Sequence, residues 1–120
     1  MSETPAPPVG PYTPAVRAGD WLVCSGQVPL KDGRLVDGGV AEQTRQCVEN
    51  VRALLATHGA RLDQVAKTTV FLTDIADYAE MNDAYMSALG AHRPARSAVA
   101  VAGLPLGARV EIEAWAYLGS

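Results

Sequence analysis

Two segments of the chain repeat hydrophobic residues at the spacing of an α-helix. Between residues 39 and 58 apolar side chains recur three and four positions apart, and Gly59 follows in the place of a C-cap. The same period returns from Asp77, which stands at capping-box spacing from Glu80, and it ends at Gly90. These patterns predict two amphipathic helices, each with an apolar stripe to cover.

Other segments have the length and composition of β-strands. WLVCSGQVPL (21–30) contains a glycine and a proline that end or bulge it, and the Asp-Gly turn of KDGRL (31–35) follows. VAKTTVFL (65–72) is rich in β-branched and aromatic residues, and polar and apolar residues alternate over 96–101 and 109–118. The order strand pair, helix, strand, helix, strand pair predicts an α+β fold, with both helices on one face of a mixed sheet in two layers.

The last two strands place charges on faces that should be covered. In 96–101 the valines and Ser97 share one face, and Arg96 lies on the other with two alanines. In 109–118 valine, isoleucine and alanine alternate with Glu111, Glu113 and two aromatic residues. We expect the valine and isoleucine faces to meet the helices. The other faces mix small, aromatic and charged residues, which suits a subunit interface that contains a site.

Length and composition fit one compact domain over residues 1–120. The chain has 48% apolar and 19% charged residues, the balance of an ordinary globular protein. No apolar run approaches the roughly 18 residues of a membrane helix. The proline-rich residues 1–14, which we expect to be extended or irregular, lack the basic and apolar regions of a signal peptide. We therefore expect a cytoplasmic protein with no membrane partner.

Charge and metal-binding residue types narrow the candidate chemistry further. The formal net charge is −3 and the ten Lys and Arg are scattered, which disfavours nucleic acid as a partner. Cys24 and Cys47 form no CxxC motif and are expected in the core. Neither His58 nor His92 has a Cys, His or carboxylate at ligand spacing, so we expect no metal site.

The charges on the covered faces have two interpretations. A guanidinium forks onto a carboxylate through two parallel hydrogen bonds, so a partly buried Arg96 could anchor a small organic acid. Glu111 beside it could hold a water molecule and accept its proton. Alternatively, Arg96 and Glu111 form a structural cross-strand ion pair. Their spacing leaves both interpretations open.

Several motifs, taken in order along the chain, resemble one family. They are GPY (10–12), CSGQVP (24–29), QTRQCVENVRALL (43–55), KTTVFLTD (67–74), MNDAY (81–85), PARSAVAVAGLP (94–105) and VEIEA (110–114). On these residues the chain resembles the RidA/YjgF family of small imine and enamine deaminases. The C-terminal motifs are the most specific part, because PARS, the LP turn and VEIE occur together and in order.

The resemblance implies a fold and a set of site residues. Family members are similar in fold to the small trimeric chorismate mutase, with helices outside, sheets lining a central barrel, and sites between subunits. By the resemblance, Arg96 grips the substrate carboxylate and Glu111 positions a water, while Tyr12, Ser25 and Asn82 complete the pocket. Each of these three also has a plainer interpretation: Tyr12 staples the arm, Ser25 satisfies a turn, and Asn82 is a solvated helix residue.

The implied reaction is a hydrolysis that needs no cofactor. An enamine such as 2-aminoacrylate, released by pyridoxal-phosphate dehydratases, tautomerises to a 2-imino acid. Water then attacks the imine carbon to give a 2-keto acid and ammonia. An imine is already electrophilic, so the protein has mainly to orient it and supply the water.

The chain departs from the best-known deaminase members in three places. The stretch between Asn82 and Arg96 is shorter, Arg93 stands where they usually carry an aromatic residue, and Ala98 stands where many have a cysteine. The missing thiol matters least, because the hydrolysis requires no nucleophilic cysteine. Arg93 is either a second positive charge at the pocket rim, favouring a substrate with a second carboxylate, or a solvated loop residue.

Other functions compatible with the same fold are a regulatory trimer that binds a small acid without converting it, a deaminase dedicated to one pathway, and a ribonuclease. The acidic balance disfavours the ribonuclease. A binder that had lost catalysis would be expected to lose Glu111 while keeping Arg96, and this chain keeps both.

Overall fold

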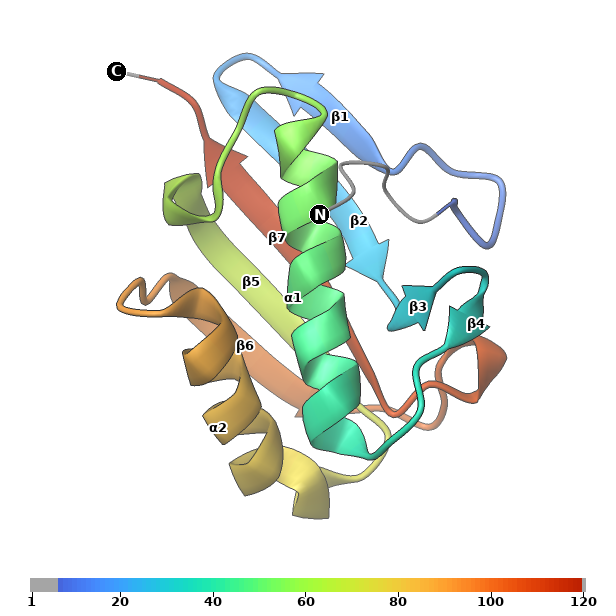
Figure 1. Cartoon of the computed structure of the whole chain (residues 1–120). Helices are drawn as coiled ribbons and strands as arrows, with labels where there is room; N and C mark the ends of the chain where they lie inside the picture. The colour runs from blue at the N-terminus through green and yellow to red at the C-terminus, as the bar shows by residue number, and fades with distance from the viewer. Residues whose placement is uncertain (1–6, 120) are drawn as a thin grey trace.

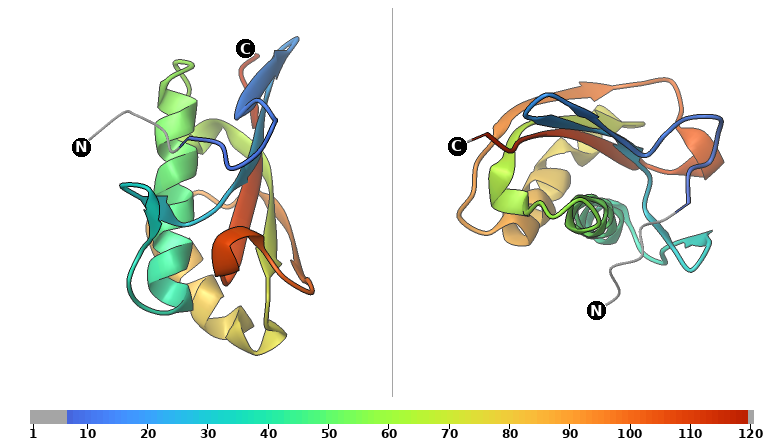
Figure 2. Two further views of the ribbon diagram at one scale, coloured as in Figure 1. Left: turned by 90° about the vertical axis from the view of Figure 1, so that its right-hand side faces the viewer. Right: turned by 90° about the horizontal axis from the view of Figure 1, so that it is seen from above.

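A mixed five-stranded β-sheet carries two α-helices on one of its faces (Figures 1 and 2). The computed structural model describes residues 7–119, so the first part of the predicted proline-rich arm, residues 1–6, lies outside it. The sheet order is β1-β2-β7-β5-β6. Its strands are β1 (Ala15–Ala18), β2 (Trp21–Gln27), β5 (Val65–Leu72), β6 (Ala95–Ala100) and β7 (Val110–Tyr117). The helices are α1 (Val40–Ala56) and α2 (Tyr78–Leu89).

The connectivity agrees with the predicted order but not with every expected pairing. All neighbouring strands are antiparallel except β5 and β6, which run parallel because α2 connects them across the sheet. Strand β5 therefore lies between β6 and β7, and the last two strands are not a pair. Strand β1 was not predicted, because four residues give too short an alternation to recognise.

The predicted turn between short strands is a β-hairpin of β3 (Leu30–Lys31) and β4 (Arg34–Leu35). Asp32 and Gly33 both have positive φ, 54° and 80°. Two consecutive positive φ values are typical of the type I′ turn, whose twist matches that of antiparallel strands. Short 3₁₀ helices precede β5 (Leu62–Gln64), α2 (Ile75–Asp77) and β7 (Pro105–Gly107).

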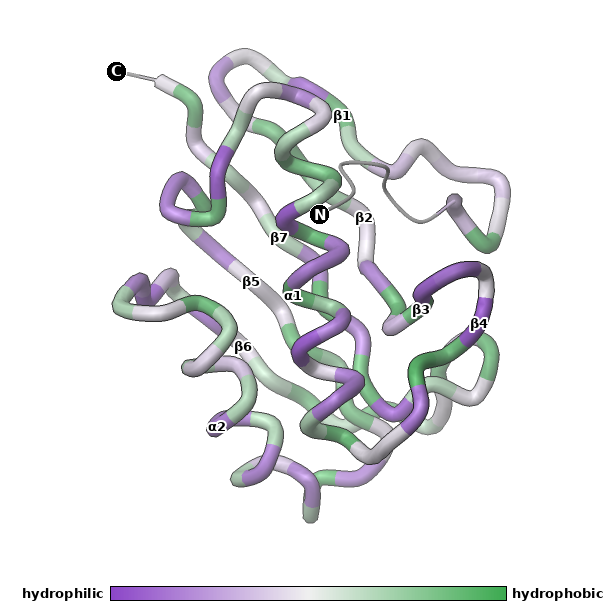
Figure 3. Tube along the Cα trace, viewed as in Figure 1, coloured by the Kyte–Doolittle hydropathy of each residue, from purple (hydrophilic) through white to green (hydrophobic). Residues whose placement is uncertain are grey.

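Helix α1 confirms the first helical prediction. Hydrophobic and hydrophilic residues alternate along it (Figure 3), and its buried residues pack with strands of the sheet in the core. Gly59 adopts a φ of +72° just beyond its end, a conformation that glycine takes without steric cost. Helix α2 begins after Asp77 as predicted, but the capping box does not form. Instead the Asp77 carboxylate accepts two hydrogen bonds from Nη2 of Arg109, at 3.0 and 2.9 Å.

The core fills the layer between the sheet and the helices. Both cysteines lie in it, as predicted, and burial raises the pKa of Cys24 to about 11. None of the helices within residues 7–119 is long and apolar enough to cross a membrane.

The face prediction holds for β7 but is wrong for β6. Strand β7 buries its valine, isoleucine and alanine residues against the helices. In β6, Val99 is 44% exposed, and Ala98 packs against the core. The parallel register explains this, because Arg96 and Ala98 lie opposite the buried Thr68 and Val70 of β5 and must share their face.

The other face of the sheet carries no helix (Figure 2), and we call it the open face. Its exposed apolar residues are Val16, Trp21, Val99, Trp115 and Tyr117. The ring of Trp21 meets those of Tyr117 and Trp115 edge-on, with centroids 5.1 and 6.2 Å apart. An exposed apolar face of this kind is characteristic of an interaction surface.

Candidate active site

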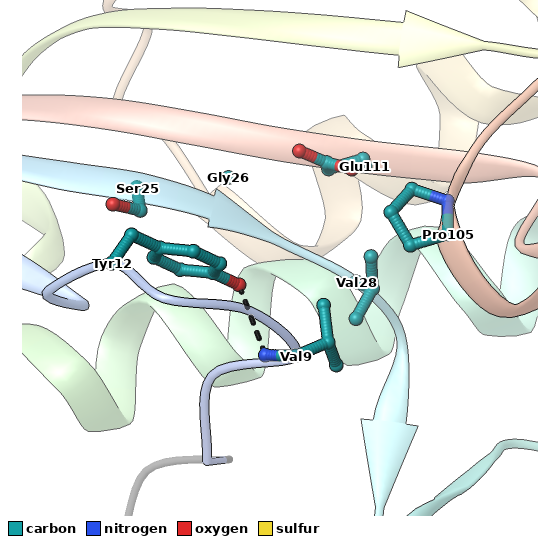
Figure 4. Close-up of a pocket in the computed structure, with 7 residues that line it drawn as sticks. All are labelled: Val9, Tyr12, Ser25, Gly26, Val28, Pro105 and Glu111. Carbon is teal, nitrogen blue, oxygen red and sulfur yellow. Dashed lines mark hydrogen bonds between the residues drawn. The ribbon is translucent and has the colours of Figure 1, made fainter.

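A pocket of about 240 Å³ opens beside β2 on the open face (Figure 4). It is lined by Val9, Tyr12, Ser25, Gly26, Val28, Pro105 and Glu111. Three of the five predicted site residues, Tyr12, Ser25 and Glu111, therefore meet in one place. They come from the arm, β2 and β7.

A bulge in β2 shapes the pocket. The pairing with β7 shifts between Cys24 and Gln27, so Ser25 and Gly26 fall outside the regular ladder. The Glu111 carboxylate occupies the space above Gly26, where any Cβ would collide with Oε2. A glycine at position 26 is thus required for the observed position of Glu111.

The surroundings of Glu111 favour a carboxyl group that holds its proton more tightly than usual. Burial of the half-buried side chain raises its pKa, and the nearby negative charge of Glu113 raises the pKa further. No ion pair or hydrogen bond to the Glu111 carboxylate forms within residues 7–119. A carboxylate with a raised pKa is a stronger base when it is ionised.

Ser25 joins the arm to β2, and Tyr12 closes a turn within the arm. The Ser25 hydroxyl donates to the carbonyl of Thr13 at 2.8 Å, and its N–H donates to the carbonyl of Pro14 at 2.8 Å. The Tyr12 hydroxyl accepts a hydrogen bond from the N–H of Val9 at 3.2 Å (Figure 4). Tyr12 thus has the plainer role considered above, whereas Ser25 ties the arm to β2 and does not satisfy a turn. Both side chains also line the pocket.

The second group of predicted residues lies between α2 and β6. The Arg96 guanidinium stands over the Tyr85 ring at 4.9 Å and the Tyr78 ring at 5.5 Å, measured to the ring centroids. Its Nη2 donates to the Tyr78 hydroxyl at 3.0 Å, and Nη1 approaches the sulfur of Met81 at 3.9 Å. Within the described part of the chain Arg96 forms no ion pair.

Asn82 lies on the same side of α2, one turn beyond Tyr78. Its Oδ1 atom is buried and has no hydrogen-bond partner among the described residues, so this oxygen is not solvated. A buried acceptor without a donor is costly, and it is the kind of group that a bound molecule could satisfy.

Arg96 and Glu111 are separated within one copy of the chain. Arg96 lies on the helix-bearing face, opposite Thr68, whereas Glu111 lies on the open face, opposite Phe71. The cross-strand ion pair therefore does not form within residues 7–119. The five predicted residues fall into two groups, on opposite faces of the sheet.

Two residues outside the predicted five, Arg93 and Tyr78, also lie in this region. Arg93 is exposed and donates to the carbonyls of Gly90 and His92, so it caps the end of α2. Tyr78 contacts Arg96 directly, although the sequence interpretation did not name it. The signal was available in its position one helical turn before Asn82.

A family model described as Endoribonuclease L-PSP matches residues 3–118. The chain belongs to this family, which is also known as RidA/YjgF. The resemblance found in the motifs is thereby confirmed, from the arm to the end of β7.

Individual family members match over nearly their whole length. A RutC family protein of Pyrococcus horikoshii is 44% identical, over 98% of this chain and 94% of its own. The mouse 2-iminobutanoate/2-iminopropanoate deaminase is 43% identical, over 99% and 90%. The crystal structure of Escherichia coli TdcF with bound serine superposes with a TM-score of 0.91 at 34% identity, over 99% and 97%. The fold is the chorismate-mutase-like fold of RidA/YjgF proteins, as predicted.

Proposed function

We propose that this RidA/YjgF protein is a cofactor-independent deaminase that hydrolyses 2-imino acids, formed from enamines of the 2-aminoacrylate type, to 2-keto acids and ammonia. The observation that carries the proposal is the unpaired Glu111 carboxylate, with its raised pKa, beside a pocket. The 43% identity to a mouse protein named as a deaminase of this kind supports it.

The proposed roles follow from the chemistry of each group. Arg96 holds the substrate carboxylate through its planar fork of donors. Glu111 accepts a proton from the attacking water, whose oxygen bonds to the imine carbon while the nitrogen is protonated. Loss of ammonia from that adduct gives the keto acid. Tyr12 and Ser25 shape the pocket, and the free Oδ1 of Asn82 accepts a hydrogen bond from the bound molecule.

The separation of Arg96 from Glu111 supports a site built by two copies of the chain. One copy cannot present both groups to one small molecule, because the sheet lies between them. We infer a homotrimer in which the open face of each copy is covered and Glu111 of one copy meets Arg96 of the next. The exposed aromatic residues of the open face support this assembly.

A paired experiment tests the proposal. Imines are generated in situ by an amino-acid oxidase from several amino acids, and keto acid formation above the spontaneous rate is measured for wild type and Glu111→Gln. The variant cannot accept a proton, so hydrolysis should fall by roughly two to four powers of ten. Binding of 2-oxobutanoate, measured by calorimetry, should survive. Glu49→Gln on α1, which removes a charge from a partly exposed ion pair with Arg52, is the matched control.

Other outcomes would favour the remaining functions. A wild-type protein that binds the acid but accelerates no imine hydrolysis would be a regulatory binder. Activity on a single imine would indicate one dedicated pathway. A ribonuclease is disfavoured because the formal net charge is −3 and ion pairs engage Arg17, Arg45, Arg52, Arg61 and Arg109, which weakens the attraction to a phosphate backbone. The cytoplasmic location stays a prediction.

A further inference from the structure

The hydroxyl group of Tyr78 has an unused hydrogen beside Arg96. A guanidinium carries only donors, so in the 3.0 Å contact between Nη2 and the Tyr78 oxygen the hydroxyl is the acceptor. Its own hydrogen must therefore point away from Arg96. Within residues 7–119 the Tyr78 hydroxyl has no acceptor for it. Tyr78 is 41% exposed, so a molecule from outside can reach this hydrogen.

The neighbouring Tyr85 differs from Tyr78 in both the burial and the hydrogen bonding of its hydroxyl group. Tyr85 is buried, and its hydroxyl lies 2.6 Å from Oγ1 of Thr68. Burial raises the pKa of Tyr85, although the Thr68 hydrogen bond and the charges of Arg96 and Arg93 oppose the shift. Its hydroxyl is thus already satisfied, and its ring serves as a support beneath the Arg96 guanidinium. Of the two tyrosines that contact Arg96, Tyr78 is the one with a donor to spare.

The geometry points to Tyr78 as a substrate-binding residue whose hydroxyl donates a hydrogen bond to the carboxylate that Arg96 holds. This inference rests on the proposed function of Arg96. Rings and a sulfur atom surround the guanidinium on the α2 side, so an anion must approach its edge. At the Nη2 edge the free hydrogens of Arg96 and Tyr78 can bind the two oxygens of one carboxylate. Donation from the guanidinium to the tyrosine oxygen also strengthens the tyrosine as a donor.

The consequence is a site that selects a carboxylate over a neutral group of the same shape. A hydrogen bond to a charged oxygen is about twice as strong as one between neutral groups. Tyr78→Phe removes one oxygen atom from an exposed position and keeps the ring under Arg96, so the fold and the packing should persist. Tyr117→Phe is the control for loss of a tyrosine hydroxyl, because Tyr117 is 43% exposed in one copy and lies outside the pocket lining. Light scattering checks that this variant keeps the wild-type assembly.

The experiment measures the affinities of 2-oxobutanoate and its neutral amide for wild type, Tyr78→Phe and Tyr117→Phe by calorimetry, with displacement titrations where binding is weak. Tyr78→Phe should weaken the acid by about tenfold and the amide by only about threefold, because the amide oxygen accepts a weaker, neutral hydrogen bond. The melting temperature should stay unchanged. Tyr117→Phe should leave both affinities unchanged. In the imine assay, Tyr78→Phe should raise KM about as much as it raises the Kd of the acid, with kcat little altered.

Three results would overturn the assignment: acid binding by Tyr78→Phe within twofold of wild type, equal losses for acid and amide, or a wild type that prefers the amide. Equal losses would mean that Tyr78 acts only by shaping the pocket. The proposed function fails separately, if the wild type hydrolyses no imine. In that case the difference between acid and amide would still identify Tyr78 as part of an acid-binding site.

Discussion

Glu111 and Arg96 have surroundings of opposite kinds. Glu111 is placed by the backbone: a bulge and the glycine at position 26 leave room for its carboxylate, and a second carboxylate stands nearby. Arg96 is placed by side chains, two aromatic rings and a sulfur atom on α2. The surroundings of Glu111 raise its pKa, which suits a base. The surroundings of Arg96 fix the plane of its guanidinium, which suits recognition of an anion.

Neither charged group has an ion-pair partner within the described residues. Each is therefore available to a group from outside the copy that carries it. We assign catalysis to Glu111 and recognition of the substrate to Arg96, and changes at each group should separate the two roles.

After Glu111→Gln, the largest effect is expected for Arg96→Lys. An ammonium cannot make the planar two-bond grip on a carboxylate, so transition-state stabilisation should fall by about 2 to 4 kcal/mol, comparable with loss of an oxyanion-hole donor. Keto acid binding should weaken as well, in contrast with Glu111→Gln. Near-normal turnover by a folded Lys variant, measured in the imine assay, would show that Arg96 has only a structural role.

The next prediction concerns mixed trimers of two inactive variants. If Arg96 of one copy works with Glu111 of another, random co-assembly of Arg96→Lys and Glu111→Gln chains creates intact sites, about one in four at equal amounts. Activity should rise to about a quarter of the wild-type value. Mixing without co-assembly is the control, and the trimer itself is checked by light scattering. A monomer at micromolar concentration, or co-assembly without recovery, would contradict the intersubunit site.

A smaller effect is expected for Gly26→Ala. The added methyl group must displace the Glu111 carboxylate, so kcat should fall by about tenfold while the Kd of 2-oxobutanoate changes little. Gly103→Ala is a suitable control, because its Cβ would meet no atom within 4 Å and its φ is not positive. An unchanged kcat would show that the exact position of Glu111 is unimportant.

The smallest predicted effect is a shift in pH dependence. The charge of Glu113 helps to raise the pKa of Glu111, so Glu113→Gln should lower that pKa. Because the base must be ionised, activity is lost as the pH falls through the pKa of Glu111, and the acid limb of kcat against pH should move to lower pH in the variant. An acid limb that stays in place would assign it to another group.

The sequence predicted the fold well where a pattern was long. The helical periods gave α1 and α2, and the Asp-Gly pair gave the hairpin at Asp32 and Gly33. The prediction failed where contacts between residues distant in sequence determine which way a side chain points or what it binds. Val99 faces outward because the parallel register with β5 sets the face of β6, and Asp77 pairs with Arg109, distant in sequence, in place of a cap.

The predicted site shows the same contrast between what local motifs predict and what only the three-dimensional arrangement reveals. The family resemblance implied that Tyr12, Ser25 and Glu111 share a pocket, and in the structure these three residues line one. The sequence did not place Arg96 relative to Glu111, because β5 separates their strands and only the sheet order reveals it. The sequence did not single out Tyr78, because this residue precedes the MNDAY motif by one helical turn.

The state of the open face can be followed by intrinsic tryptophan fluorescence. Both tryptophans of the chain, Trp21 and Trp115, stand on it with their rings in edge contact. Indole emission shifts to shorter wavelength when the ring leaves water, so the intrinsic fluorescence of the unmodified protein would register whatever covers this face. A dilution series read at the emission maximum would then follow association and dissociation of the copies without a label.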